Sequence, residues 1–599
     1  MQKDHYAFVG RITAPACSSA LYAWHGLEWP SSRKASDNIP QIPVGPLNES
    51  VRLRTILGLV GVMLLPFMNR AFHIDDPLFI WIAKQIQAHP TDPFGFDVNW
   101  YGSAMAVSDV TKNPPLASFY LALIGSLFGW SELTLHLALL PLALVAAAGT
   151  YALAKLLCGQ PALATLAASV TPVFVVSSVT VMCDVMMLAC WVWAVRAWMA
   201  GLERRNHVAL GSAAVLMAGA ALTKYFGAML IPLLLTYAIY RERRVGWWML
   251  YFAVPVAALV WYEHATAARY GRGMLVEAAA YPALYTQAQT GSMLGALSVA
   301  KAWVTLTFTG GCVATLACFA SRLWSRRVML AGVAVVLAAA TVIARMHALG
   351  AYPLPEADPA RWRVAFQLGL WGMTGFSLLA LASLDAFRRR DAASLLLLLW
   401  VVGTFLFAGF VNWVTNARSL LPLAVPAGIL MARRMESRGR SIGVNGLRSA
   451  IVPLTAAALL AVAVAWSDSA FARSEQRGAE LVMQKYGRAG RTVWFEGHWG
   501  FQYYMQELGA RALDQHRSTV ANKDLLVMPD PNTNLFGVPN WARLIDAIRV
   551  PSSRWLVTMN QDVGAGFYAD SWGPLPFMLG SALPSRFTVY QASEDAVMK

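Results

Sequence analysis

Residues 51–68 read VRLRTILGLVGVMLLPFM, and residues 73–78, a few positions further on, read HIDDPL. The first stretch is an apolar run of about the length that an α-helix needs to cross a bilayer. Arg52 and Arg54 stand near its start, and basic residues stay on the cytoplasmic side of a membrane. The sequence therefore predicts a first transmembrane helix that places the adjacent carboxylates of Asp75 and Asp76 on the outer face.

The composition is that of a polytopic membrane protein. Hydrophobic residues make up 57% of the 599 positions, and charged residues only 14%. The net charge of +15 does not indicate nucleic acid, because most Lys and Arg fall in short clusters between apolar runs, where they determine topology. The six cysteines form no Cys-x-x-Cys pair and are interpreted as small core residues. Residues 1–50 lack a signal-peptide pattern and are expected to be either a disordered cytoplasmic tail or an over-extended start.

The basic clusters orient the apolar runs, since the chain must leave and return once between consecutive clusters. This predicts an all-α transmembrane region over residues 51–467 with about thirteen spans. They are expected near 52–69, 133–156, 161–178, 184–201, 208–223, 225–240, 246–264, 298–320, 328–346, 363–384, 392–411, 418–433 and 448–467.

One apolar stretch, Leu116 to Phe128, is not counted as a crossing, because it would place every later Arg cluster outside the cell. It is expected to lie along the outer surface as an interfacial helix. Residues 70–131 then form one long outer loop, and long loops in compact folds are usually functional.

The same orientation leaves residues 468–599 on the outer side as a small periplasmic α/β domain. Short strands are predicted at 492–496, 525–528 and 555–558, with a helix at 499–508. Glu496 and His498 lie at the end of the first strand, where ordinary packing roles in a turn are favoured over a site.

Polar residues gather at the outer ends of several predicted spans. Carboxylates there can activate an acceptor or hold a cation, and cations can bind a departing phosphate. The residues concerned are Asp75, Asp76, Asp184, Lys224, Tyr225, Glu263, His264, Asn412, Asn416 and Arg418.

Each of these residues also has a structural interpretation. Asp75 and Asp76 precede Pro77 and can cap the helix that follows, and Asp184 can cap the span that it opens. Anchoring at the membrane interface or at a helix end is the corresponding alternative for Lys224, Arg418 and His264. The clustering of these residues favours a site more than any one member does.

Six stretches in this order resemble the GT-C superfamily of membrane glycosyltransferases, in the branch of protein O-mannosyltransferases, lipid A aminoarabinose transferases and RgtA/B/C/D-like bacterial enzymes. The resemblance covers roughly Val51 to Ala432. The stretches are His73-Ile-Asp75-Asp76-Pro77-Leu78, Asn113-Pro114-Pro115-Leu116, Phe128-Gly-Trp-Ser-Glu132, Asp184 in the second outer loop, Leu222-Thr-Lys224-Tyr-Phe-Gly227 and Asn416-Ala-Arg418-Ser-Leu-Leu-Pro422.

The resemblance implies a GT-C-like fold in a bacterial inner membrane and inverting transfer of a sugar from a polyprenyl-phosphate donor to a glycolipid, glycan or protein acceptor. Asp75 corresponds to the likeliest catalytic carboxylate of the family, with Asp76 and Asp184 as the further acids. Aminoarabinose transferases carry an acid and a phosphate-binding lysine before the Pro-Pro, where this chain has Lys112 and Asn113. Donor phosphate is therefore assigned to Lys112, Asn113, Lys224 and Arg418, and substrate to Tyr225, His264 and Asn416.

The sequence leaves three features undecided. A divalent cation is possible at Asp75 and Asp76, although no dense cluster with metal-ligand spacing is present. Tyr270, Arg272, Tyr281 and Tyr285 could stack on sugar rings. Two alternative functions are a flippase for a lipid-linked glycan and a non-catalytic scaffold. The flippase is disfavoured because the ionisable groups lie at the span ends and not at the membrane midplane. The scaffold is disfavoured by the gathering of polar residues at the outer span ends.

Overall fold

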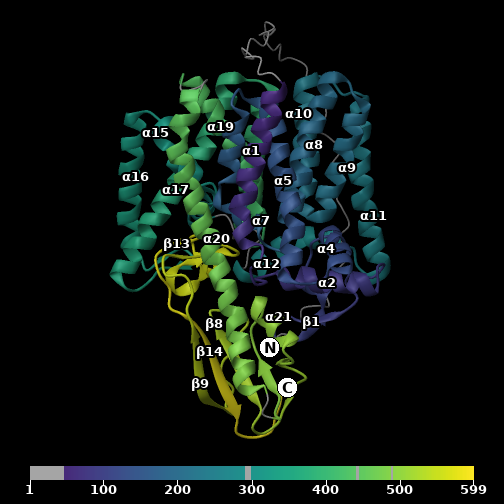
Figure 1. Ribbon diagram of the computed structural model, residues 1–599, viewed down its shortest axis with the longest axis vertical. Coiled ribbons are helices and arrows are strands. Elements are labelled where there is room, and N and C mark those ends of the chain that lie inside the picture. The colour runs from purple at the N-terminus through teal and green to yellow at the C-terminus, as the bar shows by residue number, and fades with distance from the viewer. Residues whose placement is uncertain (1–45, 291–297, 440–443, 488–489, 599) are drawn as a thin grey trace. The chain divides into compact units, whose positions relative to one another are not determined.

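In the computed structural model of the chain, residues 46–290, 298–439, 444–487 and 490–598 are described, and Figure 1 shows their arrangement. Seven described helices are long and apolar enough to cross a membrane. They are α1 (Pro46–Leu64), α5 (Glu132–Leu157), α8 (Asp184–Arg204), α16 (Arg326–Ala344), α17 (Asp358–Arg389), α18 (Ala392–Leu406) and α20 (Val444–Tyr486). A 3-10 turn extends α1 to Phe67, and a π-helical turn extends α18 to Val411. The chain is a multi-pass membrane protein.

The prediction of about thirteen spans is not confirmed. Among the described residues an eighth span is counted only if α6 (Pro161–Ser169) and α7 (Pro172–Ser178), which are bent by 66°, form one crossing. The bend falls where Pro172 removes a backbone donor and Thr171 caps the second helix. The other predicted spans are helices that are shorter, broken or, in α11, less apolar; they are α9 (His207–Thr223), α10 (Leu230–Glu242), α11 (Ala253–Tyr270), α13 (Val299–Cys312), α14 (Thr315–Cys318), α15 (Ala320–Leu323) and α19 (Ala424–Ser437).

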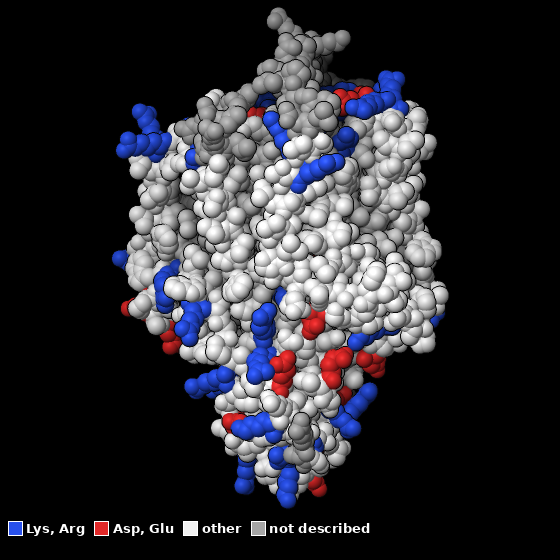
Figure 2. Space-filling model, viewed as in Figure 1, with Lys and Arg blue, Asp and Glu red and all other residues white. Residues whose placement is uncertain are grey.

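One end of the helical bundle, called here the basic end, collects the Arg clusters. The buried Arg433 of α19 donates to the carbonyl of Leu157 at the end of α5, and it pairs with Asp385 of α17 at 2.5 Å. Arg434 donates to the carbonyl of Leu323 in α15. Figure 2 shows this end at the top, with mostly Lys and Arg among its charged residues. A broad band with few charges lies below it, and acidic and basic residues are mixed in the lower part of the view. This pattern is typical of a membrane-embedded band.

The loop predicted over residues 70–131 lies at the opposite end and folds into short elements. They are α2 (Asp76–Ala88), the antiparallel pair β1 (Asp97–Asn99) and β2 (Ala104–Ala106), α3 (Val107–Val110) and α4 (Leu116–Phe128). The apolar helix α4 has 13 residues, too few to cross a bilayer. It packs on α2 and leaves Leu123, Leu127 and Phe128 exposed, as an interfacial helix would.

The C-terminal region contains a five-stranded mixed sheet in the order β6-β5-β8-β14-β9. Its strands are β5 (Val493–Phe495), β6 (Arg511–Ala512), β8 (Leu525–Asp530), β9 (Ala542–Val550) and β14 (Ser585–Ala592), and α21 (Trp499–Glu507) follows β5. The predicted strands and helix are present, whereas β9 and β14 were not predicted. The predicted boundary at residue 468 falls inside α20, which continues from the bundle to pack on the sheet and on α21.

The N-terminal tail predicted over residues 1–50 lies outside the described residues up to position 45. From Pro46 onward the chain is already helical, six residues before position 52, the predicted start of the first span.

Candidate active site

Asp75 stands just before α2 and directs its carboxylate away from that helix. The preceding residue, Ile74, has a φ of +49°, a left-handed conformation that is costly for a β-branched residue. The Asp75 side chain makes no capping hydrogen bond to α2. Its Oδ2 atom instead lies 3.0 Å from a terminal nitrogen of Arg418, and the side chain remains 31% exposed. The helix-cap interpretation of Asp75 is therefore not what the structure shows.

Asp184 and Lys224 complete a group of four charged residues around Arg418. Asp184 is the first residue of α8 and fully buried, and its Oδ1 atom accepts a hydrogen bond of 2.7 Å from the Lys224 ammonium. Its Oδ2 atom lies 3.8 Å from Nε of Arg418. Lys224 points inward from the end of α9 and is buried, which differs from the alternative of an interfacial anchor. We call Asp75, Asp184, Lys224 and Arg418 the charge cluster.

The charge cluster balances two cations against two carboxylates. Charges removed from water are tolerated only when they are paired and hydrogen bonded. Asp75 is its most exposed member, since Arg418 and Lys224 are 13% and 8% exposed and Asp184 is enclosed. A substrate that enters from solvent therefore meets Asp75 first, with Arg418 directly behind it.

The loop that carries Arg418 is held by the C-terminal region. The Thr415 amide donates to Asp570 Oδ1 at 3.0 Å, and the Ala417 amide donates to the carbonyl of Phe567 at 2.8 Å. Asp570 also pairs with Lys301 of α13 at 2.7 Å and accepts from the Tyr352 hydroxyl. The predicted residue Asn416 is buried, and its Oδ1 atom accepts from the Ser419 amide at 2.8 Å, so it shapes the turn that begins at Arg418.

Asp76 does not share the surroundings of Asp75. It is fully buried, and its Oδ2 atom accepts from the His73 amide at 2.9 Å. Burial raises the pKa of Asp76 to about 6, against the opposing effect of Arg70 and His73. The two adjacent carboxylates therefore have different partners: Arg418 pairs with Asp75, whereas the His73 amide donates to Asp76. Among the described residues no group of three or more His, Cys, Asp and Glu side chains is arranged to hold a metal ion.

A buried ion network lies beneath the Asp75 turn. We use this name for Arg70, His73, Asp468 and Glu475, none of which is more than 2% exposed at its side chain. Asp468 Oδ2 accepts from Arg70 at 3.0 Å, and Asp468 Oδ1 lies 3.6 Å from His73 Nε2. His73 Nδ1 lies 3.2 Å from Glu475. Asp468 and Glu475 belong to α20, so the turn after the first span is fixed to the last of the long apolar helices.

Tyr568 connects the ion network to the charge cluster. Its hydroxyl donates to Asp468 Oδ2 at 2.7 Å. The Arg418 guanidinium lies over its ring, 6.0 Å from the ring centre, within the range of a cation–π contact. Sequence reasoning assigned no role to Arg70, Asp468, Glu475 or Tyr568. The signal that could have indicated them is a set of ionisable residues directly after the first and last apolar runs.

Lys112 forms a separate group with α12 (Met274–Thr290). Its ammonium donates to Glu277 Oε1 at 2.6 Å, and Arg272 lies 3.3 Å from the same oxygen. No described hydrogen bond or ion pair joins Lys112 to the charge cluster. The cations of Lys112 and Arg272 thus contact one oxygen of the Glu277 carboxylate, and the same two cations can pair with a phosphate group.

Aromatic side chains lie beside the charge cluster. Trp413 makes edge contacts with Tyr281 and Tyr285 of α12, at centroid distances of 6.0 and 5.1 Å. Burial raises the pKa of the Tyr101 phenol, and the nearby charges of Tyr281, Asp75 and Tyr285 add to this effect. Tyr101 therefore lies near Asp75 as well as near Tyr281 and Tyr285.

The remaining predicted residues make no described hydrogen bond or ion pair with the charge cluster. Tyr225 is half-buried directly after Lys224, and Asn113 is half-buried beside Lys112. His264 is exposed on α11, and no described contact joins it to the charge cluster. His498 is buried against the Trp100 ring at 4.8 Å, and burial lowers its pKa to about 3, as suits a packing role.

Residues 112–264 match the family model described as dolichyl-phosphate-mannose-protein mannosyltransferase. The matched range contains Lys112, Asp184 and Lys224 and excludes Asp75 and Arg418. The match confirms the resemblance to GT-C membrane glycosyltransferases that the sequence motifs indicate. No curated protein sequence matches the chain.

Solved structures also match this chain, each at low sequence identity. The oligosaccharyltransferase AglB from Archaeoglobus fulgidus, in complex with an inhibitory peptide and a dolichol-phosphate, is 12% identical over 80% of this chain and 69% of its own, with a TM-score of 0.45. ArnT from Cupriavidus metallidurans, bound to undecaprenyl phosphate, is 15% identical over 81% and 94%, with a TM-score of 0.41. The arabinofuranosyltransferase AftD from Mycobacteria is 12% identical over 90% and 41%, with a TM-score of 0.36.

The buried ion network predicts a pH-dependent stability. Burial lowers the pKa of His73, but the carboxylates of Asp468 and Glu475 outweigh it and raise that pKa to about 9. Because the folded value lies above the unfolded value, the stabilisation is complete below about pH 6.5 and is lost as the pH rises through 9. We expect the midpoint of thermal unfolding to fall between pH 7 and 10, with a contribution from His73 of up to about 3 kcal/mol.

The His73→Gln variant should show a shallower decline over this range, and the exposed control His264→Gln should keep the decline of the unmodified protein. Asp76 contributes little to this decline, because its pKa of about 6 lies below this pH range. An equally steep decline in His73→Gln would show that the network is not held by a protonated histidine.

Proposed function

We propose that the protein is a membrane glycosyltransferase that moves a sugar from a polyprenyl-phosphate donor to an acceptor. The observation that carries this proposal is the charge cluster at the end of the bundle opposite the basic end, with Asp75 partly exposed and Arg418 behind it. The family match over residues 112–264 supports the class of reaction and of donor. The acceptor is a hydroxyl- or amine-bearing glycolipid, glycan or protein.

In this proposal Asp75 is the general base. The acceptor hydroxyl or amine transfers its proton to the Asp75 carboxylate while its lone pair attacks the anomeric carbon of the donor sugar. The bond between that carbon and the phosphate oxygen breaks, and its electron pair stays on the phosphate. Attack on the face opposite the leaving group inverts the anomeric centre.

Arg418 can interact with both groups whose charge changes in the reaction, the Asp75 carboxylate and the departing phosphate. Before the reaction, Arg418 pairs with Asp75 at 3.0 Å. When Asp75 takes up a proton, that carboxylate becomes neutral and the guanidinium can form charge-assisted hydrogen bonds with the departing phosphate. Asp184 holds Lys224 and the other side of Arg418, so it acts as a positioning residue that stays ionised.

The phosphate of the resting donor is proposed to bind Lys112 and the neighbouring cations, in place of Glu277. The sugar ring would stack on the aromatic side chains Tyr101, Tyr281, Tyr285 and Trp413 in front of Asp75. The lipid tail would lie along the exposed apolar surfaces of the spans.

Sugar transfer in membranes tests the proposal. Asp75→Asn removes the base while nearly preserving its volume, and we expect transfer from a matched polyprenyl-phosphate sugar to fall by roughly 10²- to 10⁴-fold. Asp97→Asn is the control, because Asp97 is exposed on β1 in the same loop and pairs only through its backbone with β2. Transfer at the normal rate by Asp75→Asn would refute the role of Asp75. Absence of transfer from every donor in a folded wild-type protein would favour a flippase or a scaffold.

The proposal also places the basic end in the cytoplasm, and the charge cluster and the C-terminal sheet in the periplasm of a bacterial inner membrane. Alkaline phosphatase fused after Lys599 is therefore expected to be active, whereas a fusion in the loop after Arg204 should be inactive. The reverse pattern would contradict this orientation.

A further inference from the structure

Two short strands of the C-terminal region expose large apolar side chains. They are β10 (Leu556–Val557) and β13 (Met578–Leu579), which pair in antiparallel fashion. Trp555, directly before β10, is 86% exposed, and Leu583, shortly after β13, is 77% exposed. A Trp side chain left in water keeps most of its large apolar surface hydrated, which is unfavourable. The two side chains therefore suit an apolar partner.

One membrane span holds this strand pair at a defined depth. The Leu579 amide donates to Oε1 of Gln367 in α17 at 2.7 Å, and the Gly580 amide donates to the Trp555 carbonyl at 2.9 Å. Between Gln367 and Arg388 at the basic end, α17 rises by about 32 Å at 1.5 Å per residue. That rise is close to the thickness of the hydrocarbon core, about 30 Å. Gln367 therefore lies near the boundary of the hydrocarbon core away from the basic end.

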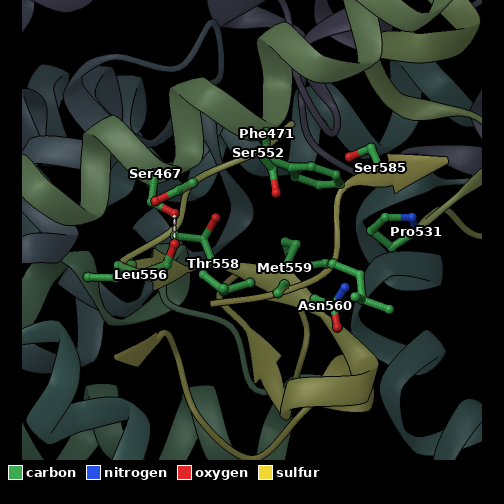
Figure 3. A pocket seen from close by; sticks show the side chains of 13 residues that line it. Ser467, Phe471, Pro531, Ser552, Leu556, Thr558, Met559, Asn560 and Ser585 are labelled. Atoms are coloured by element: carbon green, nitrogen blue, oxygen red, sulfur yellow. Dashed lines mark hydrogen bonds between the residues drawn. The ribbon is translucent and has the colours of Figure 1, made fainter. Parts of the chain in front are cut away.

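A second span gives the same depth independently. The Ser467 hydroxyl of α20 donates to the Leu556 carbonyl, as the dashed line in Figure 3 shows. From Ala450, where the apolar part of α20 begins, to Ser467 the helix rises by about 26 Å. Trp466 precedes Ser467 and is 63% exposed, and Trp362 of α17 is 47% exposed. Trp555 therefore shares its depth with two other exposed Trp side chains, the pattern of an aromatic belt at a membrane interface.

The charges around Trp555 indicate which lipids it meets. Arg554 is exposed directly beside Trp555. Arg363 of α17 is also exposed, and one of its guanidinium nitrogens lies near Gly580. Guanidinium groups beside an apolar anchor are attracted to anionic lipid headgroups.

We propose that Trp555, Leu583 and Arg554 form a membrane anchor, by which the C-terminal region inserts into the leaflet away from the basic end and binds anionic phospholipid headgroups. The anchor is independent of the proposed sugar transfer. Because the same region holds the Arg418 loop through Asp570 and Phe567, it ties the charge cluster to the membrane surface from which a lipid-linked substrate would arrive.

Photo-crosslinking of the full chain in nanodiscs of phosphatidylcholine and phosphatidylglycerol tests the anchor. The photoreactive residue p-benzoylphenylalanine is placed at position 555, at position 583 or, as the control, at position 544. Leu544 is 64% exposed on the edge strand β9 of the same region. Lipid adducts measured by mass spectrometry are expected at 555 and 583 and not at 544.

The adducts at position 555 should be enriched in phosphatidylglycerol over its share of the bilayer by roughly fivefold, and Arg554→Gln should remove most of that enrichment. Lipid adducts at 555 and 583 no more frequent than at 544 would overturn the anchor. Crosslinks at 555 to a second copy of the chain instead of to lipid would also overturn it, because they would show that a protein contact covers this surface.

Discussion

The arrangement of the site depends on one guanidinium group that serves two carboxylates. Arg418 lies 3.0 Å from Asp75 and 3.8 Å from Asp184, and the Tyr568 ring lies against its cationic face. These four residues come from the turn after the first span, the start of α8, the loop before α19 and the C-terminal region. Removing such a shared cation would leave two carboxylates close together with too little positive charge, which is costly for buried groups. Arg418 thus fixes the positions of segments that are far apart in the sequence.

The C-terminal region is part of this arrangement and not an appended domain. Asp468 of α20 accepts hydrogen bonds from Arg70, Tyr568 and Thr558, and it lies near the His73 ring. Asp570 fixes the loop that bears Arg418. One buried carboxylate therefore fixes the turn that presents Asp75, and another fixes the partner of Asp75. Together they maintain the left-handed backbone at Ile74, whose strain must be offset by surrounding contacts.

Much of this organisation is visible in the sequence, because apolar runs and Arg clusters are local signals. The long loop over residues 70–131, the short apolar helix α4 within it, the strands β5 and β8 and the gathering of Asp75, Asp184, Lys224 and Arg418 at one end of the bundle follow from such signals. The number of spans was not predicted correctly, because the hydropathy of the sequence does not reveal the bend at Pro172 or the short length of α9 and α10. Asp76 was paired with Asp75, since adjacency says nothing about which way each carboxylate points. The partners of Asp468 lie 398 and 395 residues away at Arg70 and His73, a separation across which no local pattern carries information.

Asp75 has two proposed roles that can be tested separately, as the base for the acceptor and as the resting partner of Arg418. It follows that neutralising Asp75 should stop transfer yet free Arg418 for phosphate. The most direct test is the affinity of the purified protein for a polyprenyl phosphate without sugar, measured for the unmodified chain, Asp75→Asn and Arg418→Gln. Asp75→Asn is predicted to bind about tenfold more tightly, the gain expected from roughly one charge-assisted hydrogen bond, and Arg418→Gln to bind more weakly. Unchanged or weaker binding by Asp75→Asn would contradict the account.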